Sequence, residues 1–318
     1  MATQWLRRAC LLAAGASMLV LASCGGGTVV SQLAPTRIVA FGDGMADLGQ
    51  NASGQRFTVN DGSVNNWTQH VAVRFGVALG PAKGGGTSYA MGNARVTGTP
   101  GAGGDAAALP VAQQIDAFRA VSSFGPNDLV LVSAGTSDVI VQAQAAITGT
   151  QTREQMLLAV GQAGTQLGAQ VRRLVDAGAA HVVVAGSYNL ARSAWAKQTG
   201  QQSLLEAASL EFNTKFLVSV VDLGARVLYL DAAQQFNLYE SNPASFNLTD
   251  ATNPVCNSVD AGEGIGTGVG QVDSSECTTA TLTSTSYDSF LFADRVYPTP
   301  RGHRLFGEHA AGRIRERW

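Results

Sequence analysis

The residue types that could carry out hydrolytic chemistry lie in three short segments of this chain. Residues 42–44 (GDG) follow an apolar run at 38–41, and Ser137 follows a second apolar run at 129–132. Near the C-terminus, residues 294–303 contain an aspartate, a tyrosine and a histidine. Ligands collect outside the carboxyl ends of the strands in a parallel α/β sheet. The ends of the two apolar runs are therefore where we expect a site.

The first segment resembles a known motif. Residues 41–47 (FGDGMAD) are similar to the opening block of the GDSL esterases (SGNH hydrolases), usually written F-G-D-S-L-S-D. The serine of that block is the nucleophile, and in this chain its position is Gly44. Glycine has no side chain, so nothing at this position can attack a carbonyl carbon.

A second block of the same family resembles residues 84–95 (GGGTSYAMGNAR). The resemblance implies that a backbone N–H in this block helps to hold the developing oxyanion. Gly92 is kept, whereas Asn93 stands where the family has another glycine. Asparagine tolerates the left-handed region better than most residues, so we expect the loop to keep its shape. The alternative is a glycine-rich turn without a role in anion binding.

Two further blocks complete the resemblance. Residues 135–138 (GTSD) match the block G-x-N-D, with Ser137 in place of the asparagine that donates to the oxyanion. In the last block, D-x-x-H-P-T-x-x-G-H, Asp294 matches the acid and Tyr297 stands at the catalytic histidine position. His303 matches a second, usually non-catalytic histidine.

These replacements argue against inherited activity. A serine hydrolase needs a hydroxyl, a base with a pKa near neutrality and a group that orients the base. The reference pKa of tyrosine is about 10, so Tyr297 is a poor base. Removing the nucleophile or the base of such a triad lowers turnover on the order of a millionfold. We therefore predict an inactive esterase whose Gly44 N–H and Ser137 hydroxyl still hold an acyl carbonyl or carboxylate.

Two other functions stay open. One is an ester hydrolase with relocated groups, drawn from Ser88, Ser137 and His303. The other is a purely structural envelope lipoprotein. No cofactor is expected, and the four histidines show no metal-like spacing, so no metal site is predicted. The net charge of −2, without a long basic run, argues against nucleic acid as a partner.

The N-terminus predicts export. Residues 1–23 have the basic start and short apolar stretch of a signal peptide, and residues 21–24 (LASC) match a bacterial lipobox. The match implies lipidation of Cys24 and attachment to the membrane, with residues 24–36 as a flexible tether. No aspartate follows Cys24, which by resemblance favours the outer membrane of the bacterial envelope. An ordinary secretory signal with a chance cysteine is the alternative.

The cysteines allow one pairing in the domain. Cys10 leaves with the signal and Cys24 carries lipid, so Cys256 and Cys277 remain as the possible disulfide. Free thiols or metal ligands are the alternatives, although two cysteines without a nearby histidine make a poor metal site. Both lie at about 240–290, which looks like the cysteine-bearing insertion of bacterial GDSL esterases. Such an insertion is expected at the mouth of the site, and a loosely ordered loop also fits its composition.

Hydrophobic periodicity predicts one α/β domain over residues 37–318. Continuous apolar runs indicate buried parallel strands, and apolar residues spaced by three or four indicate helices. Together with the resemblance, this order predicts a flavodoxin-like three-layer α/β/α sandwich, the SGNH hydrolase fold. The strands are expected at 38–41, 129–132, 181–185 and 226–231, and helices at 67–76, 111–121, 152–177 and 203–223. A closing helix is expected from about residue 298 to 318.

Overall fold

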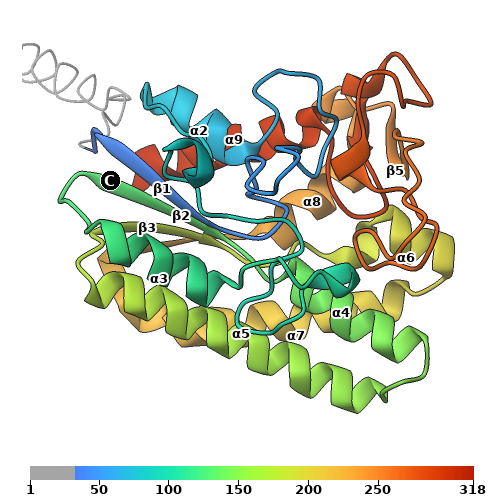
Figure 1. Cartoon of the computed structure of the whole chain (residues 1–318), viewed down its shortest axis with the longest axis horizontal. Coiled ribbons are helices and arrows are strands. Elements are labelled where there is room, and N and C mark those ends of the chain that lie inside the picture. The colour runs from blue at the N-terminus through green and yellow to red at the C-terminus, as the bar shows by residue number, and fades with distance from the viewer. Residues whose placement is uncertain (1–32) are drawn as a thin grey trace, which may run out of the picture.

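A parallel sheet forms the centre of the molecule (Figure 1). The computed structural model describes residues 33–318. Most strand residues are buried, which explains why each strand reads as a continuous apolar run. The strands pair in parallel in the order Arg37–Gly42 (β1), Asp128–Ser133 (β2), His181–Ala185 (β3) and Val227–Leu230 (β4).

A short extended segment adds an edge on the other side of β1. Ala40 donates its N–H to the carbonyl of Thr87 (3.1 Å) and accepts a hydrogen bond from the N–H of Tyr89 (2.7 Å). The chain thus passes from β1 to this edge and then back across β1 to β2. This is the strand order of flavodoxin-like folds. The predicted α/β/α sandwich is confirmed.

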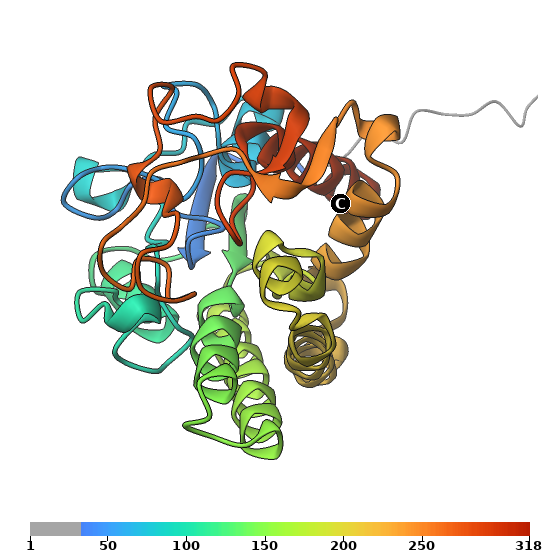
Figure 2. The same cartoon turned by 90° about the vertical axis from the view of Figure 1, so that its right-hand side faces the viewer.

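Helices cover both faces of the sheet. In Figure 1, α3, α5 and α7 lie on one side and α2 and α9 on the other, and Figure 2 shows the same layers after a quarter turn. The four helices predicted from periodicity are present within three residues of their expected bounds. The helices are Trp67–Phe75 (α2), Val111–Val121 (α3), Thr136–Ile147 (α4), Arg153–Asp176 (α5), Ala194–Thr199 (α6), Gln202–Val220 (α7), Ala232–Ser241 (α8) and Pro300–Arg317 (α9).

Helices α5 and α7 pack closely because α5 carries glycines on the shared face. A Cβ at Gly164 would lie 2.2 Å from the carbonyl oxygen of Phe212. A Cβ at Gly168 would lie 2.2 Å from Cβ of Ser219. Any larger residue at either position would push the two helices apart. The glycines of α5 therefore set the distance between α5 and α7.

Three helices, α4, α6 and α8, were not predicted from the sequence. Helix α4 begins directly after Gly135, which has φ of +111°, so its first turn coincides with residues 135–138 that resemble a catalytic block. Helix α6 has only six residues, too few to show a period. Helix α8 is capped by the side chain of Asp231, which accepts a hydrogen bond from Gln234 N–H (2.9 Å).

The segment at 240–290 is packed rather than loosely ordered. Strand Asp250–Pro254 (β5) pairs with Phe290–Phe292 (β6). The predicted disulfide is present between Cys256 and Cys277, with the two Cα atoms 5.9 Å apart. Both cysteines are buried in a small apolar cluster with Val59, Val255 and Ala293. The insertion is thus joined to the residues that follow it by strand pairing and by a small apolar cluster.

The two ends of the described chain meet. Leu33 is buried and donates its N–H to the carbonyl of Trp318 (3.1 Å), so the last residues of the predicted tether lie against the domain. The predicted signal peptide and Cys24 lie outside the described residues. Within residues 33–318, no helix is both long enough and apolar enough to span a bilayer.

Candidate active site

The turn after β1 is fixed by a buried glutamine. Gly42 has φ of +152°, and a Cβ there would lie 2.0 Å from the carbonyl oxygen of Ser133. Gln114 of α3 accepts a hydrogen bond from Gly42 N–H and donates to Gly42 O, both at 2.9 Å. The sequence did not indicate this role, because a glutamine in an amphipathic helix is expected to face water.

Two buried aspartates of the first block accept hydrogen bonds from the other blocks of the motif. Asp43 accepts hydrogen bonds from the N–H groups of Met45 (3.0 Å) and Thr136 (2.9 Å), and burial raises its pKa to about 7. Asp47 accepts a hydrogen bond from the N–H of Gly92 (2.9 Å), and burial raises its pKa to about 6. The first block thus positions the second and third through its carboxylates.

Gly44 and Tyr297, far apart in the sequence, are in contact. A Cβ at Gly44 would lie 2.7 Å from Cζ of Tyr297 and 2.9 Å from its hydroxyl oxygen. Both residues are buried, and Tyr297 is completely inaccessible. The tyrosine ring therefore occupies the space into which a side chain at residue 44 would project.

The hydroxyl of Tyr297 has no hydrogen-bond partner in the part of the chain that the structure describes. Burial raises the pKa of Tyr297 well above 10, and the nearby Asp43 raises it further. The hydroxyl of Ser137 opposes this rise, although the two hydroxyls do not reach hydrogen-bond geometry. Tyr297 is thus a neutral phenol at neutral pH and cannot serve as a base.

Asp294, at the acid position, already has four donors. Its Oδ1 accepts hydrogen bonds from the N–H groups of Val296 (2.7 Å) and Tyr297 (2.6 Å). Its Oδ2 accepts from Ser274, through the N–H (3.1 Å) and the hydroxyl (2.5 Å). Burial raises the pKa of Asp294 to about 7, and these donors oppose the rise. Tyr297 thus binds Asp294 through its backbone N–H and not through its hydroxyl.

The second block does not supply a free N–H at Gly92, which corrects the expectation from the sequence. The N–H of Gly92 is directed at Asp47. A Cβ at Gly92 would lie only 1.7 Å from Cε2 of Phe57, and the rings of Phe57 and Tyr297 are 5.0 Å apart. Asn93 adopts φ of +59°, so the expected left-handed conformation is confirmed. Two aromatic rings thus fill the space between the blocks.

The relocated catalytic set considered above is not assembled. His303 is buried and its Nδ1 accepts a long hydrogen bond from the N–H of Trp67 (3.4 Å). The hydroxyls of Ser88 and Ser137 are buried, and neither has a partner among residues 33–318. Without a hydrogen bond between a hydroxyl and an imidazole, neither serine is activated.

The burial of His303 predicts a pH effect on stability. Burial lowers the pKa of His303 from 6.5 to about 3, so the unfolded chain takes up a proton in this range that the folded chain does not. This contribution raises stability as pH rises from about 3 to 6.5 and is lost as pH falls. His303→Gln should therefore weaken the pH dependence of urea unfolding between pH 4 and 6.5.

The wild type is the reference for this measurement, and His181→Gln is the matched control for loss of an imidazole. Asp43, Asp47 and Asp294 have raised pKa values, so their contributions fall as pH rises. The three aspartates are present in both proteins. Their contributions therefore cancel when the pH dependence of unfolding is compared between the two. If the free energy of unfolding of His303→Gln rose with pH as steeply as that of the wild type, the lowered pKa of His303 would be contradicted.

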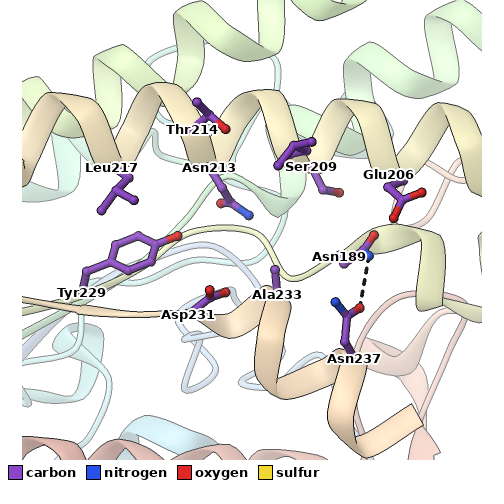
Figure 3. Close-up of a pocket in the computed structure, with 11 residues that line it drawn as sticks. Asn189, Glu206, Ser209, Asn213, Thr214, Leu217, Tyr229, Asp231, Ala233 and Asn237 are labelled. Carbon is purple, nitrogen blue, oxygen red and sulfur yellow. Dashed lines mark hydrogen bonds between the residues drawn. The ribbon is translucent and has the colours of Figure 1, made fainter. Parts of the chain in front are cut away.

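A separate pocket of about 310 Å³ lies between α7 and the carboxyl ends of β3 and β4 (Figure 3). Asn213 points from α7 towards Tyr229 and Asp231, and Asn189 donates to Asn237 across the pocket (3.1 Å). None of the site residues predicted from the sequence lines it. No group of three or more potential metal ligands occurs in the described part of the chain.

Comparison with known proteins identifies the family. The chain matches the family model described as GDSL-like Lipase/Acylhydrolase over residues 38–310. Among curated proteins, none matches the chain. One similar solved structure is an inhibitor-bound aryl esterase of M. smegmatis (16% identity, 89% of this chain and 100% of that chain, TM-score 0.46). Another is Est24, a carbohydrate acetylesterase from Sinorhizobium meliloti (14% identity, 88% and 98% coverage, TM-score 0.46). The match to the family model spans all four blocks, so the chain belongs to the GDSL-like lipase/acylhydrolase family.

Proposed function

We propose that this protein is a lipid-anchored member of the family that does not act as a serine esterase. The observation that carries the proposal is the ring of Tyr297, which fills the space beside Gly44. The nucleophile position has no hydroxyl, and the base position has a phenol whose pKa lies well above 10. Gly44, Ser137 and Tyr297 are also buried, so an ester has no access to them while Tyr297 holds this position.

We also propose that the site binds an acyl group or a carboxylate when Tyr297 moves aside. The support is a set of unsatisfied groups, since the hydroxyls of Tyr297 and Ser137 have no partner in the described chain. A buried hydroxyl without a partner costs about 1–3 kcal/mol, which a ligand oxygen would recover. The lipid anchor at Cys24 rests on the sequence of residues 21–24 alone.

Family membership supports a second candidate, a carboxylic-ester hydrolase that uses other groups. The unpartnered hydroxyl of Ser137, close to Tyr297, is the nucleophile that such an enzyme would use. This candidate needs a base that the described structure does not place beside Ser137. The activity test must therefore distinguish this hydrolase from an inactive protein.

The test is turnover of a panel of short p-nitrophenyl esters, beside an intact GDSL esterase. We expect the protein to be slower on the order of a millionfold and to resist a fluorophosphonate probe. Titration with butyrate should raise the melting temperature if the acyl site is retained. Hydrolysis that is abolished by Ser137→Ala would establish the second candidate and overturn the first.

A further inference from the structure

The amino ends of the strands carry an exposed apolar and basic surface that the proposed function does not use. Helices α2, α3 and α7 run antiparallel to the strands, so their last turns lie at this end (Figure 1). Here four valines are exposed: Val73 (63%), Val121 (76%), Val218 (67%) and Val221 (71%). We call these residues and the arginines beside them the amino-end surface.

Hydrogen bonds connect this surface to the point where the described chain begins. Leu33 donates to the carbonyl of Trp318 (3.1 Å), and the Trp318 indole donates to the carbonyl of Ala225 (2.9 Å). Ala225 lies four residues after Val221. Figure 1 shows the start of β1 and the C-terminus at this same end, on the left. The chain therefore enters the domain beside the short segment that begins at Val221 and contains Ala225.

A second connection links the start of β1 to the end of α3. The guanidinium of Arg37, the first residue of β1, donates to the hydroxyl of Ser122 (2.9 Å). Ser122 directly follows Val121. The valines on α3 and α7 thus flank the entry point of the chain rather than being scattered over the molecule.

The charge at this end favours an anionic partner. Four exposed arginines have no carboxylate within 4.0 Å in the described chain: Arg119, Arg226, Arg315 and Arg317. Arg315 instead donates to the carbonyl of Arg74, the residue after Val73. The carboxylates nearby are mostly engaged, as Asp116, Asp222, Glu308 and Glu316 pair with Arg173, Arg172, Arg74 and Arg313.

We infer that the amino-end surface docks on the bilayer that holds Cys24, which rests on the proposed lipid anchor. Eight residues lie between Cys24 and Leu33. Even fully extended, this stretch holds the domain within roughly 30 Å of the lipid. Exposed valines insert at the interface, and unpaired arginines contact anionic headgroups. Docking turns the insertion and the carboxyl ends of the strands away from the bilayer.

The test places a fluorophore at one position at a time in the full lipoprotein, reconstituted in vesicles of phosphatidylethanolamine and phosphatidylglycerol. Val121→Cys and Val221→Cys report on the amino-end surface. Val269→Cys, 60% exposed on the insertion, is the matched control. Cys256 and Cys277 are joined in the disulfide and do not react. Spin-labelled lipid should quench an NBD group at 121 and 221 several-fold more than at 269.

Equal, weak quenching at the three positions in membrane-bound protein would overturn the docking and leave the anchor intact. A blue-shifted NBD group at 221 that lipid does not quench would show a protein partner instead, which also overturns it. Failure of the anchor is separable, because an unmodified Cys24 would itself react with the fluorophore and the protein would stay soluble. Vesicles of phosphatidylcholine alone should reduce quenching at 121 and 221, since they remove the anionic headgroups.

Discussion

The variant Gly44→Ser/Tyr297→His is expected to hydrolyse short p-nitrophenyl esters at least about a hundredfold faster than Gly44→Ala/Tyr297→His. The two variants differ only by the hydroxyl oxygen at residue 44, so the ratio measures the restored nucleophile. Histidine at 297 supplies a base whose ordinary pKa is near neutrality. Activity is measured by release of p-nitrophenol, and a fluorophosphonate should label residue 44.

The two substitutions are expected to affect stability together rather than independently. Gly44→Ser alone would place its Cβ 2.7 Å from the Tyr297 ring, a clash of the kind that costs about 1–3 kcal/mol. Tyr297→His removes the phenol and makes room for the serine. The double variant should therefore be more stable than the sum of the single effects predicts, which urea unfolding of the four proteins tests.

Two further changes should increase the activity of this variant. Ser137→Asn adds a donor for the oxyanion, worth about 3 kcal/mol of barrier in comparable enzymes. Phe57→Ala uncovers Gly92 and opens the space next to residue 297. Failure of the probe to label residue 44 in a folded variant with Phe57→Ala would show that this position is not the family's nucleophile site.

Much of the fold could be predicted because the relevant signals are local. The run at 181–185 coincides with β3, and the period at 111–121 coincides with α3. Buried parallel strands and amphipathic helices each leave a pattern within a few residues. Helix α4 was missed although Val139, Ile140 and Ala143 repeat at helical spacing, because its first turn lies in a segment read as a catalytic block.

The candidate site could be predicted only in part, because its contents depend on contacts across the whole chain. Motif order placed Gly44 and Tyr297 in one site, and the structure brings them into contact. Nothing local indicated that Phe57 would cover Gly92 or that Ser274 would bind Asp294. Those contacts arise from tertiary packing of the insertion and the loop after β1, which sequence periodicity does not report.

Removal of the disulfide is expected to lower the free energy of unfolding by about 3 kcal/mol. The two cysteines are 21 positions apart, and the bond limits the conformations of this loop in the unfolded chain. The comparison is Cys256→Ala/Cys277→Ala against the wild type, measured by urea unfolding. Cys24 is unaffected, because only the two buried positions in the insertion are changed.

The same variant should also disturb the acid position, because the loop carries the residue that binds it. Ser274 lies three positions before Cys277 and donates to Asp294 through its N–H and hydroxyl. Loosening of the loop should accelerate amide hydrogen exchange at residues 274–277. Ser274→Ala is the control, because it removes the hydroxyl bond and keeps the disulfide. A loss of stability in the cysteine variant no larger than that in Ser274→Ala would show that the disulfide contributes nothing beyond this contact.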